Sequence, residues 1–154
     1  MKAGCRIIPD PVCELAAFSR PQAAASAAVQ VGSLADYRDL AGTAHALEHL
    51  CFMGSDKFPG EEEWASWLAD NGGMSNAYTA STQTNYHYQV RATSLRASLE
   101  RWSRFFVAPL LHEGAWAREL KNIDSEHSKN ISNDMWREMQ LDRSTSDPEH
   151  AVCA

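Results

Sequence analysis

Two histidines and one glutamate stand close together in the order H-x-x-E-H, as His45, Glu48 and His49. On an α-helix, residues four apart lie about 40° apart around the axis, so both imidazoles point the same way and can bind one zinc ion. Glu48 lies about 60° from His45 in the same geometry and can reach a water molecule on that metal. Two ligands and one base at this spacing predict a zinc-dependent hydrolytic site.

A five-residue match also arises by chance, and the three residues would then lie on an exposed helix face. The predicted helix over residues 44–53 is apolar, and an unpaired carboxylate would be costly to bury in it, which favours the metal site. Zinc needs a third protein ligand, and an open fourth position if it is catalytic. Glu119 and Glu126 are seven residues apart and lie within about 20° of one another on a straight helix. The alternative for this pair is a solvated acidic helix face.

The helices that must hold these residues follow from hydrophobic periodicity and end signals. Thr43 is the predicted cap of the helix that carries the motif, and Gly54 its C-terminal residue. A second helix follows the acids at 61–63 and ends at 71–73. A third helix begins near Leu95 and cannot continue past Pro109. The helical pattern over 115–141 is broken near 132–133.

Strands are predicted over residues 27–31, 74–79 and 85–91, with a turn at 81–84 and with 6–8 as a further partner strand. In the strand over 85–91, Tyr86, Tyr88 and Val90 share one face. The resulting order ββααββαα predicts an α+β fold in which helices cover an antiparallel sheet. We expect one domain over residues 1–154.

Composition excludes several classes of protein. The 154 residues are 44% hydrophobic and 22% charged, with 14 basic and 20 acidic residues and a net charge of −6, so a disordered chain and a nucleic-acid partner are not expected. The longest apolar stretch, residues 105–111, is far shorter than the ~20 residues of a membrane span. With no visible secretory signal and four cysteines without metal spacing, we expect a cytoplasmic protein with reduced thiols.

Three segments, residues 42–54, 75–79 and 124–130, closely resemble the N-terminal catalytic domain of the insulin-degrading enzyme, nardilysin and pitrilysin family, which are inverted-motif zinc metallopeptidases. The resemblance implies that Zn²⁺ is the cofactor, that His45, His49 and Glu126 are its ligands, and that Glu48 is the general base. It implies that Glu119 is a second acid supporting catalysis.

The resemblance also implies that the strand over 74–79 binds an extended peptide substrate, with Asn76 and Ala77 as the binding residues. Without it, these two residues would be part of a plain strand. The family's enzymes are far longer. We therefore expect an incomplete N-terminal domain, truncated at its C-terminal end, with a second family domain or chain as the partner that completes the active-site chamber.

Two functions remain open. The first is a zinc metalloendopeptidase domain that hydrolyses short peptides, and the second is a truncated zinc-binding homologue that acts as a binding or regulatory module without turnover. Retention of Glu48 with all three ligands favours the enzyme. We do not expect the remaining histidines or Cys51 to be ligands, and we expect four tryptophans at helical spacing to be core residues: Trp64, Trp67, Trp102 and Trp136.

Overall fold

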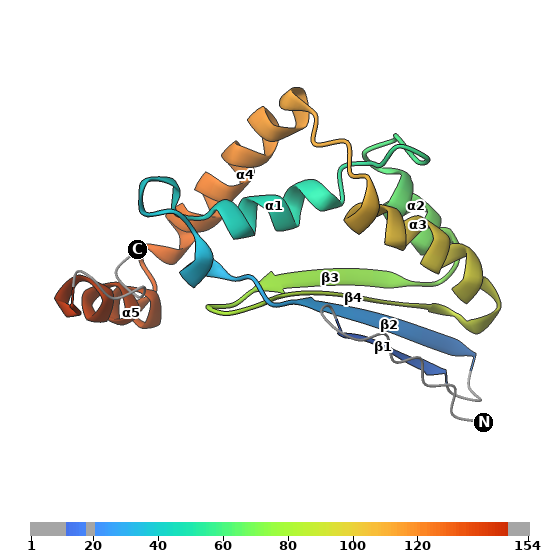
Figure 1. Ribbon diagram of the computed structural model, residues 1–154, viewed down its shortest axis with the longest axis horizontal. Coiled ribbons are helices and arrows are strands. Elements are labelled where there is room, and N and C mark those ends of the chain that lie inside the picture. Colours follow the sequence, from blue (N-terminus) through green and yellow to red (C-terminus); the bar gives the residue numbers. More distant parts are fainter. Residues whose placement is uncertain (1–11, 18–20, 148–154) are drawn as a thin grey trace.

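The structure, a computed structural model, describes residues 12–17 and 21–147 and places helices over one face of an antiparallel sheet (Figure 1). The sheet has four strands in the order β1-β2-β4-β3, and each neighbouring pair is antiparallel. Their bounds are β1 Val12–Ala17, β2 Gln22–Val29, β3 Met74–Thr79 and β4 Thr84–Arg91. β3 therefore forms one edge of the described sheet, and its outer side has no strand beside it there.

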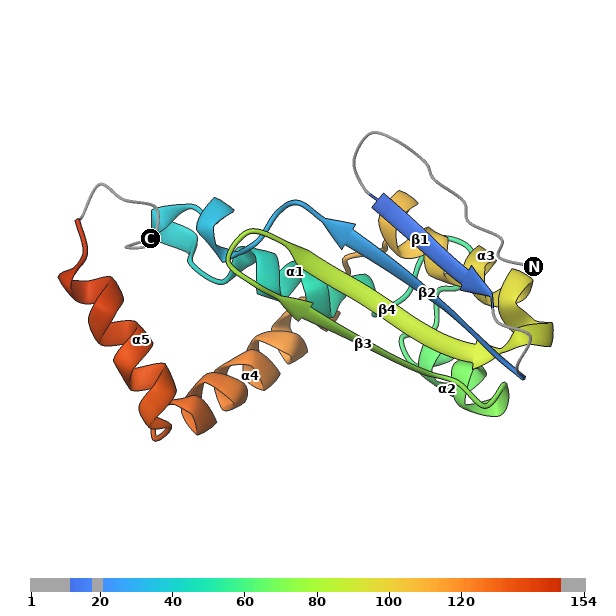
Figure 2. The same ribbon diagram turned by 90° about the horizontal axis from the view of Figure 1, so that it is seen from below.

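The five α-helices are α1 Thr43–Cys51, α2 Glu63–Asp70, α3 Leu95–Val107, α4 Glu113–Asn130 and α5 Asp134–Thr145. Single 3₁₀ turns lie at Ser33–Ala35, Arg38–Leu40 and Ala92–Ser94. Figure 1 shows α1, α2 and α3 over one face of the sheet with α4 beyond α1, and Figure 2 shows α5 projecting from the end of α4. None of the described helices is long and apolar enough to cross a membrane.

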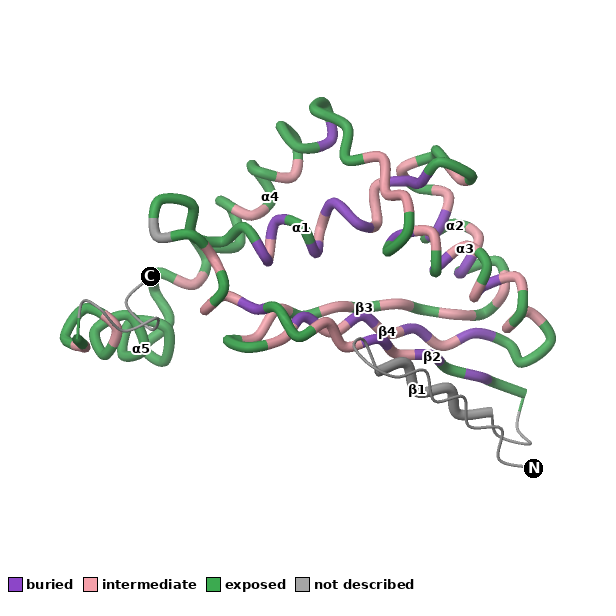
Figure 3. The backbone as a smooth tube through the Cα atoms, viewed as in Figure 1, coloured by how far each residue is buried: buried purple, intermediate pink, exposed green. Residues whose placement is uncertain are grey.

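Side chains along each strand point alternately to the two faces of the sheet, and those on one face pack against the helices to form the core. Tyr86, Tyr88 and Val90 of β4 are buried on the helix-covered face, as predicted, at 4%, 2% and 0% exposure. Three alternate residues of β2 are buried alanines, Ala23, Ala25 and Ala27, and these small side chains leave room for large aromatics. Trp102 and Phe105 of α3 occupy that room. Figure 3 shows the buried positions running along β2, β4 and the sheet-facing side of α1.

The α+β fold is confirmed, while some predicted bounds are wrong. β2 begins at Gln22 rather than at residue 27. Its first residues are mostly alanines, so the sequence shows no alternation of apolar and polar side chains there, although alternate alanines are buried. Thr84 belongs to β4, not to the turn. The partner strand predicted at residues 6–8 lies outside the described residues, and β2 pairs with β1. The predicted break near 132–133 is confirmed, since it separates α4 from α5.

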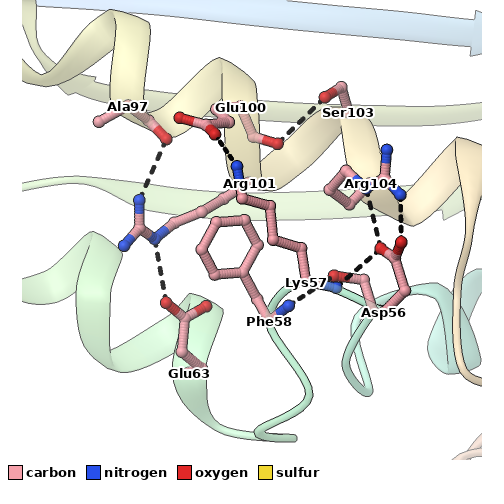
Figure 4. Close-up of polar contacts among 10 residues, drawn as sticks. Asp56, Lys57, Phe58, Glu63, Ala97, Glu100, Arg101, Ser103 and Arg104 are labelled. Carbon is pink, nitrogen blue, oxygen red and sulfur yellow. Dashed lines mark hydrogen bonds and ion pairs between the residues drawn. The ribbon is translucent and has the colours of Figure 1, made fainter.

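A cluster of aromatic and charged side chains ties the loop after α1 to α2 and α3 (Figure 4). The Arg101 guanidinium lies 4.5 Å from the Phe58 ring centre and 4.6 Å from that of Trp67, within cation–π range. Its Nε donates to Glu63 Oε1 at 3.0 Å. Arg101 of α3 therefore connects the loop that follows α1, through Phe58, to α2, through Trp67 and Glu63.

Two exposed ion pairs extend this cluster along α3 (Figure 4). Arg104 donates to both carboxylate oxygens of Asp56, and Lys57 donates to Glu100. The hydrogen bond from Arg104 holds the pKa of the Asp56 carboxyl below its usual value, and Lys57 does the same for Glu100. Both carboxylates thus stay charged well into the acid range.

Candidate metal centre

The N-terminus of α1 is held by a residue that lies upstream of the helix. Asp36 Oδ2 accepts a hydrogen bond from the Gly42 amide at 2.7 Å, and Oδ1 accepts one from the Ala44 amide at 2.8 Å. The predicted cap, Thr43, is wrong: Thr43 is the first helical residue, and its hydroxyl donates to the Leu40 carbonyl. The cap position is Gly42, whose φ of +89° is accessible to glycine without strain.

α1 divides its residues between the core and a polar site. Ala44, Ala46 and Leu50 are buried, whereas the imidazoles of His45 and His49 are half-buried on the other side. The two rings meet edge to face with centroids 4.8 Å apart, and their Nε2 atoms are 3.3 Å apart. Their separation of four residues thus aims both nitrogens at one point, as the helical spacing predicted.

Glu126 of α4 supplies the third candidate ligand atom at this point, a carboxylate oxygen. Its Oε2 lies 3.6 Å from His45 Nε2 and 3.7 Å from His49 Nε2. In a tetrahedral zinc site with bonds of about 2.0–2.1 Å, neighbouring ligand atoms are about 3.3–3.4 Å apart. The observed separations of 3.3, 3.6 and 3.7 Å are close to these edges. Two imidazoles and a carboxylate at this spacing fit zinc, and the described residues supply three ligand atoms at this point.

Glu119 contacts the far side of the His49 ring. Its Oε2 lies 2.9 Å from His49 Nδ1, and its side chain is only 12% exposed. An ionised carboxylate can only accept, so with Glu119 ionised His49 Nδ1 is the donor of this contact, and Nε2 is the ring nitrogen on the side of His45 and Glu126. Asn122 Nδ2 holds the other Glu119 oxygen at 2.9 Å. Glu119 is therefore positioned to orient a candidate ligand.

Glu48 is buried on the side of α1 that faces β3. Its residue is 8% exposed, and its Oε2 accepts a hydrogen bond from the Thr79 hydroxyl at 2.6 Å. A buried carboxylate needs such a donor, since a charge without one is costly to desolvate. Thr79 was not among the predicted site residues, although it is the last residue of the 75–79 segment and alternation places it on the same face of β3 as Ala77.

One cavity of about 920 Å³ brings these residues together. Its walls come from α1, α2, α4, α5 and β3, and it includes Glu48, both histidines, Glu119 and Glu126. Asn76 and Ala77 line it from the edge strand, with Ala77 toward the helices and Asn76 on the exposed face opposite His87. The structure thus places all seven predicted site residues around one space.

One prediction is wrong for a residue of α5 that lines the cavity. Trp136 is not a core residue: it is 47% exposed and lines the cavity with Met139 of the same helix. No residue of α5 is buried, so helical spacing marked an apolar face here without a core behind it. Trp64 and Trp102 are buried as predicted, and Trp67 packs against the same core.

The side chains that we did not expect to be ligands lie apart from the metal centre. Cys51 is buried and accepts a hydrogen bond from the Tyr86 hydroxyl at 3.8 Å, and burial raises the pKa of its thiol. His87 contacts Asn85 within β4, and His127 is exposed. Within the described part of the chain, the one group of histidine and acidic side chains with metal-binding spacing is His45, His49 and Glu126. His150 lies outside the described residues.

Comparisons with known proteins give the family and the fold that this chain resembles. Residues 15–149 match the family described as insulinase (peptidase family M16). The chain is 46% identical to the A-factor-processing enzyme of Saccharomyces cerevisiae and 42% identical to the insulin-degrading enzyme of Homo sapiens, over 84% and 79% of its length. These alignments cover 13% and 12% of the two enzymes. The crystal structure of pitrilysin superposes with a TM-score of 0.83 at 30% identity, over 88% of this chain and 14% of that one.

Proposed function

Since the chain belongs to the insulinase family of peptidases, peptidase family M16, we propose that it forms a zinc metalloendopeptidase domain that hydrolyses peptide bonds of short peptides. Membership confirms the resemblance found in residues 42–54, 75–79 and 124–130. One observation carries the proposal: three donor atoms at the spacing of a tetrahedral zinc site share a cavity with the Glu48 carboxylate. Neither a core helix nor a solvated surface requires that combination.

Each polar side chain at the centre has a role in this proposal. His45, His49 and Glu126 would hold zinc, and Glu119 would keep the His49 ring in its liganding orientation. When bound, zinc supplies a Lewis acid that polarises the scissile carbonyl and lowers the pKa of water toward about 7. Glu48 takes the proton that the attacking water loses and delivers it to the leaving amine.

The edge strand supports binding of an extended peptide. β3 has a free side among the described strands and lines the cavity through Asn76 and Ala77. A peptide that pairs with this edge adds a strand to the sheet and gains main-chain hydrogen bonds independent of its sequence. Only an unfolded or short segment can present its backbone in this way, which is why we propose short peptides as substrates.

A second family domain or chain is the partner that we propose to close the cavity. The chain spans about an eighth of the length of the relatives aligned here. Apolar side chains on the outer helices are exposed, among them Leu120 at 45% and Leu141 at 62%. A cytoplasmic location stays a prediction, and so does the absence of a nucleic-acid or membrane partner.

Peptide cleavage by the purified, zinc-loaded chain tests the proposal. We expect a short unstructured peptide to be cleaved by the wild type, and cleavage to vanish in Glu48→Gln while one zinc per chain remains bound. Glu126→Gln should instead weaken zinc binding, and Glu138→Gln, a matched change of an exposed glutamate on α5, should alter neither. A folded, zinc-bound wild type that cleaves nothing would contradict cleavage by this chain alone and favour a zinc-binding module that has no turnover without a second domain or chain.

A further inference from the structure

Two threonine hydroxyls lie near Glu48, at the turn end of the β3–β4 hairpin. Thr79 and Thr84 are directly paired across the two strands, and their Oγ1 atoms are 3.3 Å apart. Thr79 Oγ1 lies 2.6 Å from Glu48 Oε2, and Thr84 Oγ1 lies 2.8 Å from the Val31 carbonyl oxygen. The four groups thus form a continuous polar chain from the backbone before α1 to the carboxylate in the cavity.

The number of hydroxyl protons among these four groups fixes the direction of the hydrogen bonds between them. Each threonine hydroxyl has one proton to donate, and a backbone carbonyl or an ionised carboxylate can only accept. Thr84 donates to Val31, so its proton does not serve Thr79. Thr79 must then donate to Glu48, and among the described residues its hydroxyl is the one donor recorded for that carboxylate.

We propose that Thr79 is a positioning residue for Glu48, with the Thr84 side chain in contact beside it. The proposal rests on the proposed peptidase function, because it concerns how the general base is held. Thr79 occupies Oε2 of Glu48, so Oε1 is the oxygen left to take up a water proton in the cavity that Glu48 lines. Thr84 is 4% exposed and bonded to Val31, so the hydroxyl beside Thr79 is itself fixed.

This hydrogen bond also ties the base to the strand that would hold the substrate. Thr79 lies two residues after Ala77 on the same strand and the same face. Any shift of β3 that moves a peptide docked at Ala77 also moves the Thr79 hydroxyl, and with it the Glu48 carboxylate. Substrate and base would therefore keep their relative positions, which matters because a misplacement of about 1 Å can cost about 10²-fold in rate.

Matched substitutions of Thr79 test this role in the zinc-loaded full chain. Thr79→Val keeps the shape and removes the hydroxyl, and we expect kcat to fall about 10- to 100-fold with KM within about twofold and zinc content unchanged. Thr79→Ser restores the donor and should recover kcat to within about threefold. Thr82→Val makes the same change at an exposed position of the same hairpin and should have no effect. A folded Thr79→Val chain with wild-type kcat, or a serine variant as slow as the valine, would overturn the proposal.

A second measurement does not depend on turnover. In the zinc-free chain, Thr79→Val should lower Tm by about 3–6 °C, because the Glu48 carboxylate loses its donor. In a Glu48→Ala background, the same substitution should lower Tm by less than about 1 °C. Equal losses in the two backgrounds would show that Thr79 does not hold Glu48. A wild type that cleaves nothing would count against the proposed peptidase function only. The difference between the Tm losses in the two backgrounds would still decide whether Thr79 holds Glu48.

Discussion

Replacing Asp36 with alanine removes both side-chain acceptors that hold the N-terminus of α1. The Asp36 carboxylate accepts from the Gly42 and Ala44 amides, which are among the helix-start amides without an intrahelical partner. The two amides differ in what replaces the lost bond. Gly42 is exposed and its amide can bind water, whereas Ala44 is buried at 9% exposure. The cost of the substitution therefore falls mainly on the Ala44 amide.

The magnitude follows from these two environments. A buried amide left without a partner costs about 1–3 kcal/mol, and loss of a helix N-cap costs about 0.5–2 kcal/mol. We expect Asp36→Ala to lower the free energy of unfolding by about 1.5–2 kcal/mol and Tm by about 3–8 °C. Asp36→Asn keeps one acceptor oxygen and should lose about half as much.

Urea and thermal unfolding of the zinc-free chain measure this effect without a contribution from metal binding. Asp39→Ala is the matched control, because Asp39 is an exposed aspartate in the same segment. The expected order of midpoints is wild type and Asp39→Ala together, then Asp36→Asn, then Asp36→Ala. Identical midpoints for Asp36→Ala and Asp39→Ala would refute the argument that Asp36 caps α1.

Two further predictions concern the core and the surface. Leu68 is 2% exposed, so Leu68→Ala should lower the free energy of unfolding by about 2–5 kcal/mol in denaturant titrations, whereas Leu141→Ala, at 62% exposure, should change it by less than about 0.5 kcal/mol. The lowered pKa of Asp56 means that its pair with Arg104 stabilises the fold above about pH 4 and that this contribution is lost as pH falls through the lowered pKa. Arg104→Gln should therefore weaken the fall of Tm below about pH 4, and an unchanged pH profile would contradict this.

Strong periodicity made most elements predictable. Tyr86, Tyr88 and Val90 alternate with polar residues, and they form the buried face of β4. The start of β2 could not be predicted in the same way, since its alternate alanines look alike whether they face the core or solvent. Trp136 shows the converse, because the helical period identifies an apolar face but not whether anything packs on it.

Local geometry also made half of the metal centre predictable. The H-x-x-E-H spacing alone turns His45 and His49 to one side of a helix, and a seven-residue spacing does the same for Glu119 and Glu126. That α4 brings these acids to α1 did not follow from spacing, and before the structure it rested on family resemblance. The meeting of the two helices is a long-range contact between His49 and Glu119, 70 residues apart in the chain.

The contacts that hold α1 and Glu48 in place were determined only by the tertiary structure. Asp36 reaches back to the start of α1, and Thr79 approaches Glu48 from a strand 31 residues away in sequence. A helix or strand period specifies which side chains share a face, because it depends only on the local backbone. Which faces meet depends on the path of the chain between them, and that path is set by how the whole core packs.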